Sequence, residues 1–225
     1  MTSIAIVTPW WDAHELLPTY NQALYEGPVR PGDCVIVVDN GSIPPLEQTL
    51  AESTTPINLI LREQKNRGFS RACNRGYRAA AQHDAVLFLN NDVRATGPGW
   101  LDLIRENLAP GRLVGAQIRT DPHTMVDGHL IPYLDGWCIG GLRETWERVN
   151  VDGAPWDEGY EEPAYWGDND LCLRARRAGV GLSSVSLPLE HRSNYSSRRM
   201  RVDEVSARNR ERYVRRAREL GMVAT

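Results

Sequence analysis

Two carboxylates in the first half of the chain follow short apolar runs at the point where those runs end. Asp39 follows the run 34–38, and Asp92 closely follows the run 85–89. Five consecutive apolar residues are too few for an ordinary helix and are typical of a strand that is covered on both faces. Parallel strands end at the same edge of a sheet, where ligands bind in open α/β sheets. Taken alone, Asp92 is as compatible with a turn or a helix N-cap as with a ligand site.

A second group of candidate residues lies in the segment 66–76, which reads NRGFSRACNRG. Gly68 and Ser70 stand where a helix is expected to begin. Free backbone N–H groups at a helix start bind anions, and arginines strengthen such a site, so phosphate is the expected ligand. The nearby arginines are Arg67, Arg71 and Arg75. The alternative is a serine-capped amphipathic helix whose arginines are solvated.

The segment 155–174 concentrates acidic and aromatic residues. Asp168 can cap a helix that runs over 168–178 and ends before Gly179, which argues against a merely solvated acidic loop. A carboxylate held beside a hydroxyl group can remove its proton during an attack. His191 follows one more strand, a position where a lone histidine is more often structural than a ligand.

Strands and helices that alternate are predicted to position these side chains. Short links between them favour a parallel sheet with right-handed crossovers. Asp12 is the expected N-cap of the first helix. The predicted strands are 3–8, 34–38, 57–61, 85–89, 113–118 and 181–187, and the predicted helices are 12–25, 44–50, 69–82, 142–149, 168–178 and 202–220.

Length and composition limit the possible fold classes, partners and locations of the protein. The 225 residues, 41% hydrophobic and 24% charged, suit one substantial α/β core. The net charge of −3 gives no general attraction to nucleic acid or anionic lipid. The four cysteines are widely spaced in apolar segments, which indicates reduced core thiols. No apolar run reaches the roughly 20 residues of a membrane span, and the first residues lack the features of a signal peptide, so a cytoplasmic location is expected.

Three motifs, in this order and at strand ends, resemble the nucleotide-sugar half of family 2 glycosyltransferases with the GT-A fold, especially the rhamnosyltransferase-like branch. They are Val38–Ser42, Asn66–Phe69 with Asn74 and Gly76, and Leu89–Val93 with Gly99–Leu101. The resemblance implies an α/β fold with a Rossmann-like, mostly parallel central sheet flanked by helices and a C-terminal helix. It further implies a nucleotide-sugar-binding half (1–95), an acceptor-binding and catalytic half of the same domain (96–196) and a helical tail (197–225).

The resemblance also assigns residues to the donor. Those expected to contact the nucleotide-diphosphate sugar are Thr8, Pro9, Asp39, Asn66, Gly68, Arg71, Asn74, Asn90 and Asn91. Asp92 is the expected ligand of Mn²⁺ or Mg²⁺ on the diphosphate, and Asn90 stands where the family's Asp-x-Asp motif has its first aspartate. His191 begins a His-x-x-x-x-Ser pattern and is the expected second protein ligand of the metal. Trp10 or Trp11 is placed to stack on the base.

The acceptor side is assigned in the same way. The sequence Gly167-Asp168-Asn169-Asp170-Leu171 resembles the family's Glu-Asp-x-Asp-Leu motif, with Gly167 in place of the leading glutamate. Asp168 is the expected general base, ahead of Asp170 and then of Glu161 and Glu162. The expected acceptor-binding residues are Trp137, Gly140, Trp166 and Asp170. From the residues alone, the glycine-rich stretch around Gly140 is either a bend that admits a sugar or a tight turn before a helix.

The resulting expectation is a metal-dependent, inverting glycosyltransferase that uses a UDP-, GDP- or dTDP-linked sugar and a carbohydrate or other hydroxyl acceptor. Two alternatives remain, a nucleotidyltransferase that makes a nucleotide sugar and a non-catalytic nucleotide-sugar-binding module. A nucleic-acid acceptor gains no support from the net charge. The charged helix 202–220 is expected to pack on the body, or to contact a polymeric acceptor, an anionic membrane or the second subunit of a homodimer.

Overall fold

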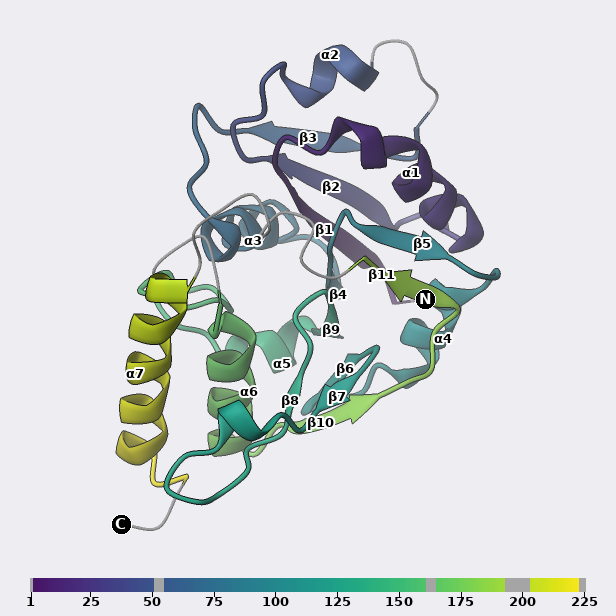
Figure 1. The fold of residues 1–225 in the computed structure, drawn as a ribbon. Helices are drawn as coiled ribbons and strands as arrows, with labels where there is room; N and C mark the ends of the chain where they lie inside the picture. The colour runs from purple at the N-terminus through teal and green to yellow at the C-terminus, as the bar shows by residue number, and fades with distance from the viewer. Residues whose placement is uncertain (1, 51–54, 161–164, 193–202, 223–225) are drawn as a thin grey trace.

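The computed structural model describes residues 2–50, 55–160, 165–192 and 203–222. Its centre is a seven-stranded sheet (Figure 1). In spatial order the strands are β10 (Gly181–Ser184), β6 (Arg112–Gly115), β9 (Cys138–Leu142), β4 (Ala85–Leu89), β1 (Ile4–Trp10), β2 (Cys34–Asp39) and β3 (Leu59–Arg62). Two small antiparallel pairs accompany it, β5 (Val93–Ala95) with β11 (Leu189–His191), and β7 (Ile118–Arg119) with β8 (Tyr133–Leu134).

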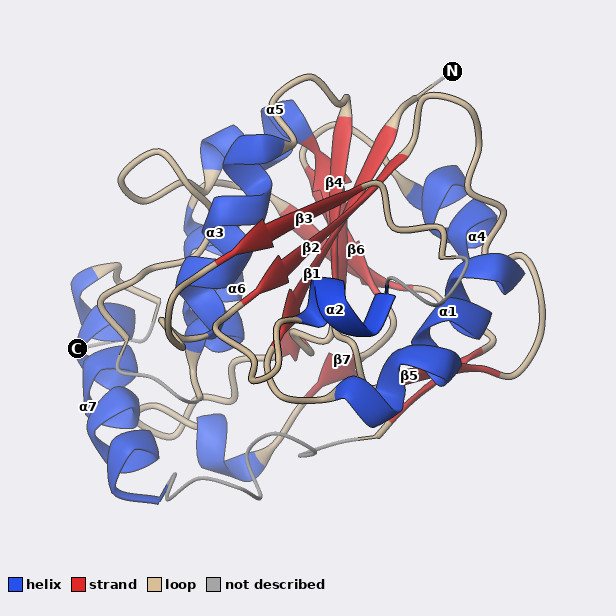
Figure 2. Cartoon of the chain, turned by 90° about the horizontal axis from the view of Figure 1, so that it is seen from above, coloured by secondary structure: helices blue, strands red, loops and turns tan. Residues whose placement is uncertain are grey.

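Helices cover both faces of this sheet, as the view along it shows (Figure 2). The longer ones are α1 (Leu17–Glu26), α3 (Phe69–Ala79), α4 (Trp100–Asn107), α6 (Gly167–Arg177) and α7 (Asp203–Glu219). The shorter ones are η1 (His14–Leu16), α2 (Leu46–Leu50), η2 (Pro122–Thr124) and α5 (Arg143–Arg148). The apolar sides of α1 and α4 pack on one face, and those of α3, α5 and α6 pack on the other. Within the described ranges, no helix is both long and apolar enough to cross a membrane.

The predicted fold class is confirmed, because β1 pairs in parallel with β2 and β4 and the chain's helices flank the sheet. All five residues of β4 are buried, as expected for a strand covered on both faces. The predicted C-terminal helix is α7, which packs on α6 through Tyr213 and Ala217.

The main error concerns β9, which was expected to be a bend or turn. It is an antiparallel strand that lies between β4 and β6. A Cβ atom at Gly141 would lie 2.7 Å from Leu113 Cδ2 and 3.2 Å from Trp146 Nε1, so close packing explains this glycine. Some predicted strand boundaries also differ from those observed. The segment 113–118, predicted as one strand, is divided between β6 and β7.

The N-cap predicted at Asp12 is also wrong. The 3₁₀ helix η1 begins after Ala13 without a side-chain cap. Asp12 has a positive φ of 45°, and its carboxylate accepts a hydrogen bond from Ile43 N at 2.7 Å. The side chain therefore joins two loops at the strand ends instead of starting a helix.

Gly76 allows α3 to approach the sheet closely, since a Cβ atom there would lie 2.2 Å from Val7 Cγ1. The change Gly76→Ala gains about 1 kcal/mol in helix propensity. Overpacking costs about 1–3 kcal/mol. We therefore expect a net loss of about 1 kcal/mol in the free energy of unfolding, measured with urea. Gly181→Ala is the control, because its Cβ would meet its nearest atom at 3.8 Å. A Gly76→Ala variant as stable as the Gly181→Ala variant would contradict this packing.

Candidate active site

The pairing of β5 with β11 brings Asp92 and His191 together. In this antiparallel pair His191 lies opposite Val93, next to Asp92. His191 Nε2 lies 3.0 Å from Asp92 Oδ1, and both side chains are mostly buried. A second polar group, Asn90 Nδ2, lies 3.5 Å from the same imidazole nitrogen. Two predicted metal ligands that are 99 positions apart in the chain therefore meet at the end of β4.

The chemistry of this pair fits a divalent cation. Apart from His191 Nε2 at 3.0 Å, the buried Asp92 Oδ1 has no polar partner among the described residues. A buried carboxylate with so few partners is costly unless a cation compensates its charge. Carboxylate oxygen and neutral imidazole nitrogen are ligands that Mn²⁺ accepts. Among the residues that the structure describes, no group of three His, Cys, Asp or Glu side chains gathers as a metal site.

Trp137, a predicted acceptor-binding residue, adjoins this pair. Its ring stacks on the imidazole of His191, with centroids 5.0 Å apart and an interplanar angle of 12°. Its carbonyl oxygen accepts a hydrogen bond from Asn90 N at 2.8 Å. Trp137 therefore packs against the candidate metal ligands from the β9 side.

Asp168 lies in the first turn of α6 and not at its cap, which is Trp166. Its Oδ2 accepts a hydrogen bond from Gly136 N at 3.0 Å, and Oδ1 accepts one from Asn169 N at 3.0 Å. Burial and, next, the negative charge of Asp135 raise the pKa of Asp168 to about 7. Asp135 itself is held by Arg119 Nε at 2.5 Å. A carboxyl group with this pKa is suited to act as a base near neutral pH.

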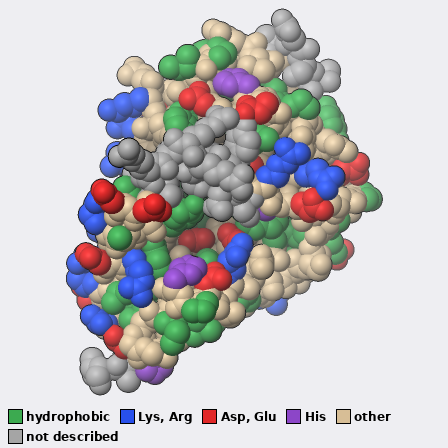
Figure 3. Space-filling model, in the orientation of Figure 1, with side chains coloured by type: hydrophobic (Ala, Val, Ile, Leu, Met, Phe, Trp, Pro, Cys, Tyr) green, Lys and Arg blue, Asp and Glu red, His purple; other side chains and the backbone are tan. Residues whose placement is uncertain are grey.

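The adjacent residues Gly136 and Trp137 connect the two centres. Gly136 donates its backbone N–H to Asp168, while Trp137 stacks on His191. The candidate base and the candidate metal ligands thus border the same short turn before β9. On the face shown in Figure 3, acidic side chains lie in a recess beside the undescribed residues, and basic side chains stand near its rim.

Asn40, which the sequence reasoning missed, organises the donor-side loops. Its Nδ2 donates to Asn66 Oδ1 at 2.8 Å and to Gly68 O at 3.1 Å, and its Oδ1 accepts from Arg67 N at 2.8 Å. Asn66 Oδ1 also accepts from Gly68 N at 2.8 Å, so the Asn66 side chain holds the loop before α3. The signal that was available is the position of Asn40 directly after a strand-end aspartate.

The carboxylate of Asp39 is hydrogen-bonded within the loop that follows β2. The side chain is fully buried, and its oxygens accept hydrogen bonds from Ser42 N at 2.8 Å and Leu46 N at 3.0 Å. Arg62 forms an ion pair with the same carboxylate. The Asp39 carboxylate therefore shapes the loop after β2, and its contact with the base or ribose of a nucleotide stays a prediction.

The side chains of Thr8 and Trp10 are buried in the core. Thr8 Oγ1 and Tyr20 OH form a hydrogen bond of 2.6 Å. Trp10 is 1% exposed and packs edge-on against Tyr20. Pro9 and Trp11 are both partly exposed. Of the two adjacent tryptophans, Trp11 is therefore the one that remains accessible.

Asn74 connects α3 to the loop that contains Trp156 and Glu158. Its Nδ2 donates to Trp156 O at 2.8 Å and to Glu158 Oε1 at 3.0 Å, and its Oδ1 accepts from Trp156 N at 3.0 Å. Both polar atoms of the side chain are used in these contacts, and the role of Asn74 in donor binding stays a prediction. Arg71, on the same helix, stays half-exposed with Glu158 at 3.5 Å. Asn91 is buried beside Asp92 in the turn after β4.

Three of the four predicted acceptor-binding residues lie elsewhere. Gly140 is within β9, where a Cβ atom would lie 3.3 Å from Leu87 Cδ1. Trp166 is 5% exposed and packs on Tyr213. Asp170 is fully buried and accepts hydrogen bonds from Tyr160 OH and from Arg174 Nε. These three have packing or hydrogen-bonding contacts in the fold, and their contact with an acceptor stays a prediction. Glu161, Glu162 and the segment 193–202 lie outside the described residues.

Solved structures with a similar fold come from sugar-transferring enzymes. The mannosyltransferase PcManGT of Pyrobaculum calidifontis, solved with GDP-Man and Mn²⁺, matches with a TM-score of 0.61 at 17% identity, over 81% of this chain and 54% of that one. Glucosyl-3-phosphoglycerate synthase of Mycobacterium tuberculosis was solved with Mn²⁺, UDP and glucosyl-3-phosphoglycerate. It matches with a TM-score of 0.63 at 18% identity, over 100% of this chain and 81% of that one. GalNAc-T7, solved with UDP, GalNAc and Mn²⁺, matches with a TM-score of 0.64 at 11% identity, over 85% of this chain and 44% of that one.

At such low identity these structures show the fold alone, and they confirm the predicted GT-A type. The chain spans about half the length of the mannosyltransferase and of GalNAc-T7. Comparison with curated proteins gives no sequence match. The profile of "Glycosyl transferase family 2", however, matches residues 12–150, which is more than half of the chain. The protein therefore belongs to glycosyl transferase family 2.

Proposed function

We propose that the protein is a metal-dependent, inverting glycosyltransferase that moves a sugar from a nucleotide-diphosphate donor to an acceptor hydroxyl. The observation that carries the proposal is the convergence of two centres on the turn 136–137. A carboxylate with a raised pKa borders one residue of that turn, and the Asp92–His191 pair borders the other. Family membership and the Mn²⁺ in the similar structures support it.

Each residue has one task in the proposed reaction. Asp92 and His191 hold the cation, which when bound neutralises charge on the diphosphate and on the departing nucleoside diphosphate. Asp168 accepts the proton of the acceptor hydroxyl while that oxygen attacks the anomeric carbon. The bond from the anomeric carbon to the diphosphate breaks on the opposite side. Displacement from one face inverts the anomeric configuration, and the proton remains on Asp168 until it passes to solvent.

The two predicted halves of the chain share the central sheet in this proposal. Residues 1–95 bind the donor, with the N-terminus of α3 and the half-exposed Arg71 near the diphosphate. Residues 96–196 supply the base and the acceptor surface. The motifs also resemble those of the rhamnosyltransferase-like branch, which supports placing the protein in that branch.

The pH dependence of kcat follows from the pKa of Asp168. The base acts in its deprotonated form, and burial and Asp135 raise its pKa to about 7. We expect kcat to fall by about tenfold per pH unit below this value and to level off above it. Asp135→Asn removes the neighbouring negative charge and is expected to move this midpoint to lower pH. A kcat that does not change between pH 5 and pH 8 would contradict the assignment.

The donor is identified by a thermal-shift screen of UDP-, GDP- and dTDP-sugars with and without Mn²⁺. A ligand at 100 times its dissociation constant stabilises the native state by about 2.7 kcal/mol. We expect at least one of these donors to raise the melting temperature only when Mn²⁺ is present. If every nucleotide sugar leaves it unchanged at millimolar concentration, the proposed function is wrong.

A further inference from the structure

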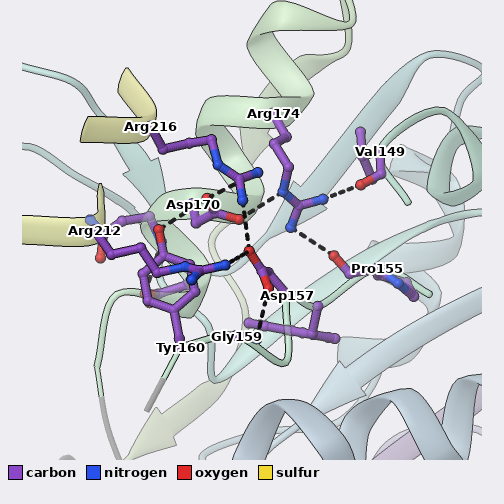
Figure 4. A network of polar contacts seen from close by, with 12 residues as sticks. Val149, Pro155, Asp157, Gly159, Tyr160, Asp170, Arg174, Arg212 and Arg216 are labelled. Carbon is purple, nitrogen blue, oxygen red and sulfur yellow. Dashed lines mark hydrogen bonds and ion pairs between the residues drawn. The ribbon is translucent and has the colours of Figure 1, made fainter. Parts of the chain in front are cut away.

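A buried network of charged side chains lies on the side of α6 that faces α7 (Figure 4). It joins two carboxylates, Asp157 and Asp170, to guanidinium groups from two helices. The guanidinium groups belong to Arg174 of α6 and to Arg212 and Arg216 of α7. Neither carboxylate belongs to the candidate metal pair or serves as the candidate base. The network needs a role of its own, because burying several charges gives little net stability.

Asp157 attaches α7 to the loop that precedes α6. Its Oδ2 accepts hydrogen bonds from Arg212 at 2.9 Å and from Arg216 at 2.8 Å, and Oδ1 accepts one from Gly159 N at 2.7 Å. Burial alone would raise the pKa of Asp157, but the hydrogen bonds from Arg212 and Gly159 and the two positive charges keep it below its usual value. This carboxylate therefore stays ionised and bound to α7 at neutral pH.

Asp170 attaches Arg216, which also binds Asp157, to α6. Its oxygens accept hydrogen bonds from Tyr160 OH at 3.0 Å and from Arg174 Nε at 2.7 Å. Arg216 Nη1 lies 3.8 Å from Asp170 Oδ1 while Arg216 Nη2 binds Asp157. Arg216 thus bridges the loop and the helix, as the planar fork of a guanidinium permits.

The bridge acts close to the candidate base. Asp168 and Asp170 are two residues apart in α6, which is about 200° around a helix, so they point to opposite sides. Asp170 faces the network, and Asp168 faces Gly136. The loop held by Asp157 also contacts α3 through Asn74, which binds both backbone groups of Trp156. The donor-side helix, the base-carrying helix and α7 are therefore joined through this loop.

We propose that Arg216 is a positioning residue for the transfer reaction, which sets the position of α6, and so of Asp168, relative to the donor-side helix α3. This inference rests on the proposed function. Arg216 does not touch the reacting atoms, so its loss should misplace the base without weakening the donor site. Misplacing a reacting group by about 1 Å can cost about 100-fold in rate.

The test compares Arg216→Gln with Arg215→Gln. Arg215 is the neighbouring arginine on α7, but its side chain is 65% exposed and meets Glu219 only at 4.0 Å. The measurements are kcat, its pH profile, and the dissociation constant of the Mn²⁺–nucleotide complex by calorimetry. We expect Arg216→Gln to lower kcat about 10–100-fold and to move the pH midpoint, with the dissociation constant within about twofold. Arg215→Gln should match the wild type in every measurement.

Arg216→Lys supplies a milder variant that keeps the charge but reaches only one carboxylate. We expect a smaller loss in kcat than with glutamine, again without loss of nucleotide affinity. The inference is overturned if kcat stays within about twofold of wild type in both variants. It is also overturned if kcat and nucleotide affinity fall in parallel, which would show a merely structural role. A wild-type protein that binds no Mn²⁺–nucleotide complex would instead refute the proposed function itself.

Discussion

Replacing Asp168 with asparagine is expected to lower kcat about 10²–10⁴-fold, the usual contribution of a positioned general base. The amide oxygen of asparagine can still accept one of the two hydrogen bonds from Gly136 N and Asn169 N, and the size of the side chain is unchanged, so α6 should keep its place. It cannot take a proton from the acceptor hydroxyl. Donor affinity should therefore remain near that of the wild type, and steady-state kinetics with calorimetry on the same preparation measure both quantities.

The matched control is Glu144→Gln, since Glu144 is an exposed acid on α5. It should leave kcat unchanged. Transfer at the wild-type rate by the Asp168→Asn variant would remove this residue from the mechanism. A loss of nucleotide affinity equal to the loss in kcat would also contradict the assignment, because it would place Asp168 in the donor site.

Replacing Asp92 with asparagine is expected to weaken Mn²⁺ binding at least about 100-fold. Removing even an indirect partner of a metal ligand costs 10–100-fold. Transfer should fall in proportion at low Mn²⁺ and recover only partly at high Mn²⁺. Titration of Mn²⁺ followed by electron paramagnetic resonance gives the affinity directly.

The same change should not destabilise the metal-free protein. Apart from His191 Nε2 at 3.0 Å, the buried Asp92 Oδ1 has no polar partner among the described residues. Asparagine can keep a contact with this imidazole while its neutral side chain removes the cost of burying a charge. We expect the metal-free Asp92→Asn variant to melt at the wild-type temperature or above it. Glu190→Gln, an exposed neighbour of His191 on β11, is the control and should change neither property. A large drop in metal-free stability of Asp92→Asn would show that Asp92 has a structural role.

Much of the fold was predictable because apolar runs and strand-end polar residues alternate regularly. The positions of β1, β2 and β4 follow from runs that are buried on both faces. The antiparallel strand β9 was not predictable in this way. Its two central glycines suggest a turn, and only the contacts of Gly141 with Leu113 and Trp146 show why a strand requires glycine there.

The candidate site was predictable where a residue's role depends on its place at a strand end. Asp92 lies at such an end, and His191 lies on the strand that pairs beside it. Asp39 and Asn74 were assigned to the donor because their positions match family motifs. Their donor contacts stay predictions. Their hydrogen bonds in the structure go to neighbouring loops, and those partners are set by three-dimensional packing that one sequence does not reveal.

The most direct test of the central claim is electron–nuclear double resonance on Mn²⁺ bound to the protein with a nucleoside diphosphate. If Asp92 and His191 hold the cation on the diphosphate, the spectrum contains ³¹P couplings from the phosphates and a ¹⁴N coupling from the imidazole. The ¹⁴N coupling should disappear in His191→Gln, while the ³¹P couplings remain. Bound Mn²⁺ that shows neither coupling in the wild type would contradict the account.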